Sequence, residues 1–391
     1  MREDLNSWDE LLPEALPTPC FVVDEDRLLA NLAILSSVQQ HTGAKILLAL
    51  KGFAMFSVFP LLRRVLHGVC ASSPHEARLG REEFGGEVHV FAAAYSEDDI
   101  HELALLADHL VFNSFAQRDR FLEPARDCAA KAGRSLAFGL RVNPEHSEGA
   151  VPLYDPCSPG SRLGIRSVVF AGRALSDISG LHFHTLCEQD AAPLARTLAV
   201  IERTFGEFLP GMRWLNIGGG HHITRPGYDL PLLCRCITRM RDAYGLDVYI
   251  EPGEAVALNA GVLVSTVLDV VEADMPVALL DSSASAHMPD VLEMPYRPEV
   301  IHAGKPGEKS WTCRLAGKSC LAGDVIGEYS FAAPLQAGDR LIFLDMAHYT
   351  MVKTTTFNGL ALPGIALVEN GSRALRMVRR FGYEDFKTRL S

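Results

Sequence analysis

The chain has 391 residues, of which 48% are hydrophobic and 22% charged, as in a globular enzyme large enough for two domains. Its formal charge of −11 and pI near 5.7 argue against nucleic acid or an anionic membrane as partners. No apolar stretch approaches the roughly 18 residues that a membrane span needs, and the acidic N-terminus lacks the apolar core of a signal peptide. Nine scattered cysteines are typical of reduced thiols, so we expect a cytoplasmic protein.

The first two thirds of the chain alternate short apolar runs with amphipathic segments. From about residue 26 to 260 this alternation predicts βαβ units around a parallel sheet. About eight strands over this length favour a (β/α)₈ barrel over an open sheet. The predicted strands are Lys45–Leu50, Gly68–Ala71, Val88–Ala92, His109–Asn113, Leu136–Val142, Leu181–His184, Trp214–Ile217 and Val248–Ile250, and the predicted helices include Asp24–Gln39, Pro74–Phe84, Glu97–Asp108 and Asp190–Phe208.

The pattern changes after about residue 260, where β-branched runs lack helical periodicity. Glycine and proline separate these runs, which predicts a β-sandwich or β-barrel. The segment Pro19–Val23 is a further predicted strand and a candidate to pair with this second domain. We therefore assign residues 26–260 to the barrel, and residues 1–25 with 261–391 to a β-domain. The runs are Val262–Val271, Val277–Leu280, Val325–Glu328 and Arg340–Leu344.

Lys51 stands directly after the apolar run Ile46–Leu50 and before Gly52. Burial lowers the pKa of a lysine and leaves its amine nucleophilic, as Schiff-base chemistry requires. A solvated lysine at a strand end is the more frequent outcome for an isolated residue. The carboxyl ends of barrel strands are where catalytic groups gather, and Lys51, His184, Gly218 and Glu251 all fall at such ends.

Two further strand ends carry groups that suit a phosphorylated cofactor. Gly218–Gly220 leave backbone N–H groups free to approach a phosphate, and we expect their loop to lead toward a helix N-terminus. Glu251, before Pro252–Gly253, could hold the proton on a pyridine nitrogen. A flexible turn and a solvated glutamate are the alternatives. Together with Lys51, the pattern predicts a pyridoxal-phosphate enzyme.

Strand alternation puts His182 and His184 on one face, where they could form a metal pair, pack in a core, or stack on a cofactor ring. We favour stacking by one imidazole. No third ligand stands at a telling spacing, although His221–His222 leaves a metal formally open. Cys234 and Cys236 lack a second metal-spaced pair, so no metal is expected.

The second domain offers a possible proton donor and an amine anchor on one glycine-bounded loop, Cys320 and Asp324. Cysteine in such a loop is more often plain filler. The phenol of Tyr349 could reach a phosphate. Further carboxylates, which would suit a polyamine or merely solvate a loop, are Asp281, Asp290 and Glu293.

Together these residues resemble the fold-type III pyridoxal-phosphate decarboxylases, the family of ornithine and diaminopimelate decarboxylases with an alanine racemase-like architecture. The resemblance runs through nearly the whole chain and is closest to the carboxynorspermidine decarboxylase group. The motifs that carry it are Leu48–Lys51 with Ser57–Pro60, Phe183–Glu188, Gly218–Thr224, Glu251–Ala255, His287–Pro298 and Leu315–Cys320.

The resemblance implies a homodimer whose active sites combine the barrel of one subunit with the cysteine loop of the other. It also implies a role for each matched residue. Lys51 would hold the cofactor covalently, His184 would stack on its ring, Gly218, Gly219, Gly220 and Tyr349 would bind its phosphate, Glu251 would pair with its ring nitrogen, Arg162 would lie near it, and Cys320 would contribute to protonation from the partner chain.

One position departs from the wider family. Ornithine and diaminopimelate decarboxylases carry an arginine, which helps to neutralise the phosphate, where this chain has Glu254. This difference disfavours ornithine and diaminopimelate as substrates and agrees with the carboxynorspermidine group. We hypothesise that His221 or His222 compensates. The candidate substrate-binding acids are Glu254, Asp281, Asp290, Glu293 and Asp324.

The expected reaction is decarboxylation of carboxynorspermidine, carboxyspermidine or both, giving norspermidine or spermidine. These substrates differ by one methylene, which a pocket distinguishes by only about 1–3 kcal/mol. The alternatives are another amino-acid decarboxylase or a racemase of the same architecture, and a catalytically silent regulator. A racemase needs a second base opposite Lys51, and no tyrosine is convincingly placed for it. Retention of Lys51, Glu251 and Cys320 weighs against the regulator.

Overall fold

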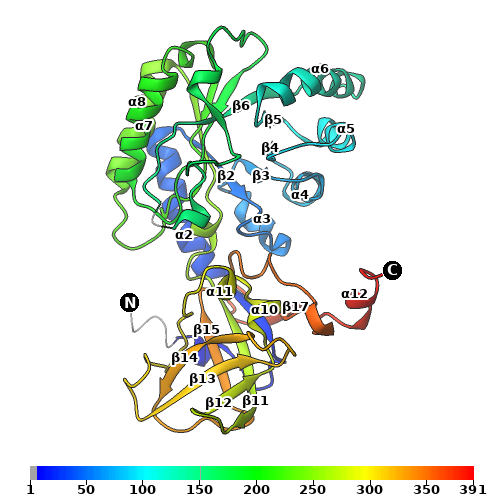
Figure 1. Cartoon of the computed structure of the whole chain (residues 1–391), viewed down its shortest axis with the longest axis vertical. Helices are drawn as coiled ribbons and strands as arrows, with labels where there is room; N and C mark the ends of the chain where they lie inside the picture. The colour runs from blue at the N-terminus through cyan, green and yellow to red at the C-terminus, as the bar shows by residue number, and fades with distance from the viewer. Residues whose placement is uncertain (1–6, 150) are drawn as a thin grey trace. The chain divides into compact units, whose positions relative to one another are not determined.

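The computed structural model describes residues 7–149 and 151–391. They divide into two compact units (Figure 1). One unit takes the chain up to Leu29 together with Ala257–Ser391, and the other is Ala30–Val256. Within the described residues, no helix is long and apolar enough to cross a membrane.

The unit Ala30–Val256 is a closed barrel of eight parallel strands, which confirms the predicted (β/α)₈ fold. Neighbouring strands pair in the order β2, β3, β4, β5, β6, β8, β9 and β10, and β10 pairs with β2 to close the ring. The short strand β7 (Ile165–Arg166) pairs with β6 beside the ring. The barrel strands are β2 (Lys45–Ala49), β3 (Gly68–Ala71), β4 (Glu87–Phe91), β5 (His109–Phe112), β6 (Ala137–Asn143), β8 (Gly180–His182), β9 (Trp214–Asn216) and β10 (Asp247–Ile250).

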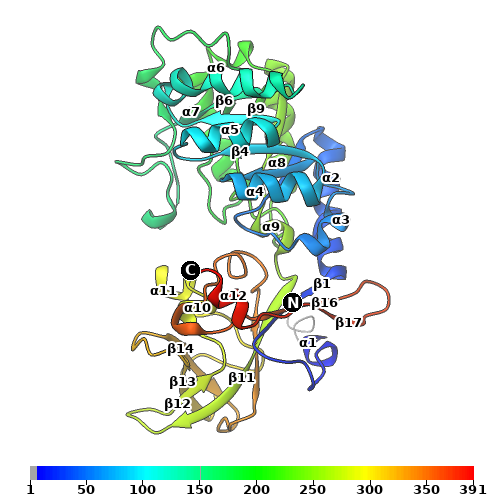
Figure 2. The same cartoon turned by 90° about the vertical axis from the view of Figure 1, so that its right-hand side faces the viewer.

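Several of the helices between these strands begin at side-chain caps. Ser96 accepts a hydrogen bond from the backbone N–H of Asp99, whose carboxylate bonds back to Ser96, so a capping box starts α5. In Figure 2, α4, α5 and α6 lie along one side of the barrel. The helices are α2 (Glu25–Thr42), α3 (Phe59–Leu62), α4 (Pro74–Leu79), α5 (Glu97–Leu106), α6 (Phe115–Lys131), α7 (Ala191–Phe205), α8 (Leu230–Tyr244) and α9 (Glu254–Ala257).

The predicted helix Pro74–Phe84 changes its geometry midway. After α4, residues Gly80–Phe84 form a π-helical turn. A Cβ on Gly80 would lie 2.3 Å from a methyl carbon of Val69 on β3, so only glycine allows this approach of helix to strand.

Trp214 fills the barrel near the amino ends of its strands. A Cβ on Gly180 would lie 1.9 Å from the indole, and one on Gly139 would lie 2.4 Å from it. Glycines on the two neighbouring strands β6 and β8 therefore make room for the indole of Trp214.

The second unit is built around an eight-stranded mixed sheet. Strand β1 (Cys20–Asp24) pairs antiparallel with β11 (Gly261–Val271) and parallel with β16 (Gly364–Val368). The predicted pairing of Pro19–Val23 with the second domain is thus confirmed. The other strands are β12 (Val277–Leu280), β13 (Trp311–Gly317), β14 (Val325–Phe331), β15 (Arg340–Leu344) and β17 (Leu375–Arg379), and the short helices are α1 (Ser7–Leu11), α10 (Ala284–His287), α11 (Asp290–Glu293) and α12 (Tyr383–Lys387).

Alternate residues of β1 enter two separate hydrophobic clusters. Phe21 packs in a cluster with Leu263, whereas Cys20 and Val22 pack in another with Val262. Side chains of a strand alternate between its faces, so both faces of the central strands are buried. This explains why every residue of β1 is apolar up to Asp24 and buried.

His287 should make the stability of this unit depend on pH. Its side chain is 0% exposed, and burial lowers its pKa to about 4. The unfolded chain, with a histidine pKa of about 6.5, then binds more protons than the folded chain at acidic pH. The stabilisation is complete above about pH 6.5 and should fall by up to about 1.4 kcal/mol per pH unit as the pH drops toward 4.

Urea unfolding at several pH values between 7 and 4 measures this slope. His287→Asn should flatten it, whereas the same change at the exposed His101 should not. An unchanged slope in His287→Asn would contradict the assignment.

Candidate active site

The carboxyl ends of the barrel strands bring together the residues predicted from the sequence. Lys51 lies two residues beyond β2, and its side chain is exposed. His184 follows β8, and its Nδ1 accepts a hydrogen bond of 2.9 Å from the backbone N–H of Gly219. We expected the amine of Lys51 to be buried away from water, but in the described chain it is exposed. Its charge nevertheless lowers the pKa of His184, after the larger effect of burial.

Glu251 is held rigidly at the end of β10. Asn216 Nδ2 donates a 2.6 Å hydrogen bond to its Oε1, and His182 Nε2 lies 3.6 Å from its Oε2. Burial disfavours the carboxylate, but His182 and Asn216 outweigh that effect and hold its pKa below the usual value. Burial also lowers the pKa of His182. Glu251 is therefore an oriented anion, with the charge needed to hold a proton on a heterocyclic nitrogen.

Two residues that the sequence did not single out also belong to this end of the barrel. Arg141, on β6, is 5% exposed and donates a 3.3 Å hydrogen bond to the carbonyl of His184. Burial lowers its pKa to about 10, against the opposing charge of Glu251. The Cys70 thiol, on β3, lies close enough to Glu251 that this charge, after burial, raises its pKa. Arg141 could have been recognised in the sequence as a candidate site residue, because it is a charged residue within a largely apolar strand.

The three glycines are packed too closely for side chains. A Cβ would lie 2.5 Å from Phe183 O at Gly218, 2.4 Å from Glu251 O at Gly219 and 1.9 Å from Leu186 O at Gly220. Gly218 and Gly220 also have positive φ, of 72° and 79°. Close packing against neighbouring backbone therefore requires glycine at these three positions.

Other features of the glycine loop differ from the prediction. The Gly218 N–H donates to Asn216 Oδ1 at 2.9 Å and that of Gly219 to His184, so both donors already have partners. No helix N-terminus follows directly, because a β-bridge between Gln189 and His221 intervenes and α8 begins only at Leu230. That part of the prediction was wrong.

Gly219→Ala should lower both stability and cofactor retention. The added methyl would meet the carbonyl oxygen of Glu251, and forced packing of this kind costs about 1–3 kcal/mol. Thermal unfolding and absorbance of the bound cofactor measure the two effects. Gly211→Ala is the matched control, because nothing lies within 4 Å of a Cβ there. Equal behaviour of the two variants would mean that the loop tolerates the methyl group.

His221 and His222 differ in what they offer in place of the missing arginine. His221 is 2% exposed, and burial lowers its pKa to about 4, so its imidazole is neutral at pH 7. It does not bring the positive charge that our hypothesis required. His222 Nε2 lies 3.6 Å from Oε1 of Glu254, the residue at the arginine position.

The other predicted acids lie in the sheet unit, and each has a partner there. Ser283 Oγ donates to Asp324 at 2.8 Å, and Ser265 Oγ donates to Asp281 at 2.6 Å. The Lys353 ammonium pairs with both Asp290 and Glu293. A substrate amine would have to compete with these contacts, so their role as amine anchors remains a prediction.

The remaining predicted site residues lie in loops of the two units. Cys320 is exposed, and its backbone N–H donates to Asn358 Oδ1 at 2.6 Å. Tyr349 has a positive φ of 47°. Arg162, in the barrel unit, is exposed, and its carbonyl accepts a 2.8 Å hydrogen bond from Asn113.

Comparison with known proteins decides the family. A family model described as the C-terminal sheet domain of pyridoxal-dependent decarboxylases matches residues 20–347. The chain belongs to the pyridoxal-dependent decarboxylases. It is accordingly a carboxy-lyase that works with pyridoxal 5′-phosphate.

Similar members of this family match over nearly their full length. A carboxyaminopropylagmatine decarboxylase of Synechocystis is 49% identical, over 96% of both chains. A carboxynorspermidine/carboxyspermidine decarboxylase of Campylobacter jejuni is 42% identical, over 96% of this chain and 99% of the relative. The crystal structure of carboxynorspermidine decarboxylase from Campylobacter jejuni, complexed with norspermidine, superposes with a TM-score of 0.87 at 41% identity, over 96% of this chain and 100% of that one.

The barrel residues fit the cofactor of this family. Such a site needs an amine, a close-packed anion cradle and a carboxylate for the pyridine nitrogen. Lys51 and Glu251 supply the amine and the carboxylate at neighbouring strand ends, Asn216 fixes the carboxylate, and the glycine loop is the candidate for the phosphate.

Proposed function

We propose that this decarboxylase acts on carboxynorspermidine, carboxyspermidine or both, and releases norspermidine or spermidine with CO₂. The proposal rests on the full-length similarity to two proteins from Campylobacter jejuni. One is the carboxynorspermidine/carboxyspermidine decarboxylase, and the other is the carboxynorspermidine decarboxylase whose crystal structure contains norspermidine. Glu254, at the position where ornithine and diaminopimelate decarboxylases have arginine, supports a substrate outside those two classes.

Each barrel residue has a distinct role in this proposal. The cofactor supplies an electron sink for the pair released from the departing carboxylate. Lys51 holds it covalently, Glu251 keeps the proton on its ring nitrogen, His184 stacks on the ring, and Gly218–Gly220 approach its phosphate. Asn216 acts through Glu251, because its 2.6 Å hydrogen bond fixes the carboxylate.

The cysteine loop of a partner subunit completes the proposed site. Tyr349 contacts the phosphate, Cys320 contributes to protonation of the α-carbon, and Asp281, Asp290, Glu293 and Asp324 are candidates for the substrate amines. Glu254 and Arg162 act from the barrel. We infer a homodimer that works in the cytoplasm, which agrees with nine cysteines that are all free thiols.

The direct test of this function is product analysis. The cofactor-loaded enzyme is incubated with carboxynorspermidine or carboxyspermidine, and the amines are identified by mass spectrometry. Norspermidine and spermidine, each lighter than its substrate by CO₂, are expected. Unchanged substrate in both reactions would refute the proposal.

Cys320→Ala should lower kcat by about 10²-fold, the lower end of what one proton donor contributes. KM should change little, because the thiol acts after substrate binding. Steady-state CO₂ release measures both constants, with Cys234→Ala as the control. Wild-type kcat in Cys320→Ala would remove the thiol from the reaction.

A mixing experiment tests whether sites are shared between subunits. Random reassociation of Lys51→Ala with Cys320→Ala chains makes half of the dimers mixed, and each mixed dimer has one intact site if the barrel and the cysteine loop come from different subunits. Activity should then recover to about a quarter of wild type. No recovery would mean that both residues act within one chain.

A guanidine-bearing substrate is the second candidate, because the 49% identical relative is named for carboxyaminopropylagmatine. By their names, the substrates share a carboxylated aminopropyl group and differ at the distal end, which is an amine or a guanidine. The ratio of kcat/KM values for carboxynorspermidine and carboxyaminopropylagmatine decides between them.

A further inference from the structure

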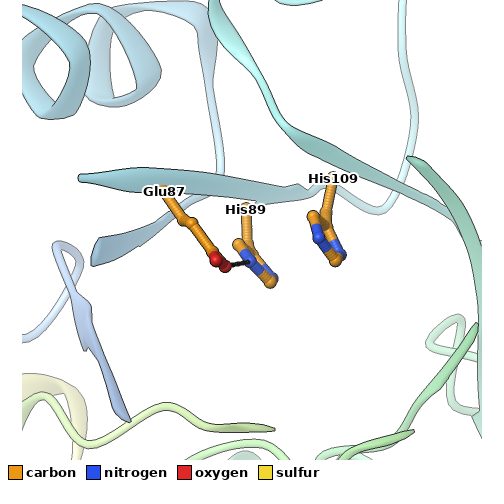
Figure 3. Close-up of side chains that lie close together, drawn as sticks. All are labelled: Glu87, His89 and His109. Atoms are coloured by element: carbon orange, nitrogen blue, oxygen red, sulfur yellow. Dashed lines mark hydrogen bonds and ion pairs between the residues drawn. The ribbon is translucent and has the colours of Figure 1, made fainter. Parts of the chain in front are cut away.

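Three metal-ligating side chains meet at the amino ends of barrel strands, at the opposite end from Lys51 and Glu251. Glu87 and His89 extend from β4 and His109 from β5 (Figure 3). One potential ligand atom from each of the three lies within 4.8 Å of the others. We propose that Glu87, His89 and His109 bind one divalent transition-metal ion, of which Zn²⁺ is the representative.

Strand geometry alone puts these side chains together. Glu87 and His89 are two residues apart on one strand, so they share the inner face of the barrel. Strand pairing places His109 directly beside His89. The arrangement is therefore fixed by the β4–β5 register and not by a flexible loop.

The spacing of the first two ligands is close to that of a tetrahedral site. Glu87 Oε2 and His89 Nε2 are 3.0 Å apart. Nitrogen and oxygen ligands at about 2.1 Å from a tetrahedral ion lie about 3.4 Å from each other. An ion between them would replace the shared proton, and the two side chains need to separate by only a few tenths of an ångström.

Buried nitrogens provide independent evidence for a ligand. His89 is 2% exposed, and among the described residues neither its Nδ1 nor that of His109 has a hydrogen-bond partner. Buried polar atoms in proteins are nearly always satisfied, by protein, water or an ion. In this proposal the ion binds His89 through Nε2, so the Nδ1 of His109 is the unpartnered buried atom that it would satisfy.

Binding requires one rearrangement. The rings of His89 and His109 stack at 3.9 Å with an angle of 14°, so their in-plane lone pairs do not converge. His109 must turn away from the stack, toward the ion. We therefore expect weaker binding than at a site already arranged for metal.

The charged groups around Glu87 leave its Oε2 atom available to the ion. The Lys45 ammonium lies 3.8 Å from Glu87 Oε1, the oxygen that His89 does not contact, and 3.1 Å from Asp247 Oδ2, which offsets its charge. The Glu87 side chain is 34% exposed. Solvent thus reaches the cluster, so an ion can enter and a water molecule can take the fourth position.

The proposal is tested on the cofactor-loaded enzyme after chelator treatment. Calorimetric titration with Zn²⁺ should give one site per chain, and Co²⁺ should give the visible absorbance of a tetrahedral site. Glu87→Gln and His109→Asn should each weaken binding at least about tenfold, since loss of even an outer-shell partner costs 10–100-fold. Glu97→Gln, a change at an exposed surface glutamate, is the control.

Thermal unfolding separates a lost ligand from a lost fold. Without metal, Glu87→Gln should still unfold in one cooperative transition, because glutamine keeps the size and the hydrogen bond to His89 although it loses the ion pair with Lys45. Added Zn²⁺ should then raise the unfolding temperature of wild type but not of this variant. Wild-type affinity in both cluster variants, or no binding by wild type, would overturn the proposal.

Discussion

Lys51→Ala should lower kcat/KM for CO₂ release by more than about 10⁴-fold, beyond the upper range for loss of a single acid–base group. In the proposed function this amine attaches the cofactor covalently, and Lys51 is the only lysine among the predicted site residues. Its position two residues after β2 places it with His184 and Glu251 at the carboxyl ends of the strands. The variant should also purify without the absorbance of covalently bound cofactor.

Lys131→Ala, at an exposed position in the last turn of α6, is the control and should retain wild-type turnover. Full CO₂ release by Lys51→Ala would show that another amine carries the cofactor. Loss of turnover with the absorbance unchanged would separate catalysis from attachment.

Glu251→Gln should reduce kcat by about 10²–10³-fold, the usual effect of removing one preorganised electrostatic group. An amide of the same size cannot hold the proton on the ring nitrogen, so the cofactor becomes a weaker electron acceptor. The fold should survive, because glutamine can still accept from Asn216 through its carbonyl oxygen.

The loss should appear in kcat and not in cofactor content, which absorbance measures on the same samples. Glu251→Asp, which keeps the charge but shortens the reach, should recover part of the rate. Equal activity of Glu251→Gln and wild type would show that the ring nitrogen needs no carboxylate.

The barrel could be predicted strand by strand because parallel strands buried on both faces are nearly continuous apolar runs. Three strands of the sheet unit were not predicted. Strands β16 and β17 lie in a segment rich in arginine and glycine, and β13 interrupts its apolar positions with Arg314. Strand β16 also pairs with β1, as in the pairing of Val22 and Ala366, and no local pattern reveals so distant a partner.

Site residues could be predicted where the residue type alone indicates its chemistry. They could not be predicted where the role depends on contacts with residues that are distant in the sequence. Lys51, Glu251 and the glycines stood out at strand ends. The pairing of Lys353 with Asp290 could not be foreseen, since 63 residues separate them. Likewise, the sequence predicted no metal site, because only the β4–β5 register brings His89 beside His109.

The most direct test of the account is CO₂ release with pyridoxal phosphate from a panel of carboxynorspermidine, carboxyspermidine, meso-diaminopimelate, ornithine, lysine and arginine. We predict release from the two carboxylated polyamines, with little from the amino acids. Preference for a simple amino acid would contradict the substrate assignment based on Glu254. No release from any of these compounds would contradict the polyamine assignment and leave the guanidine-bearing substrate or a catalytically silent member of the fold.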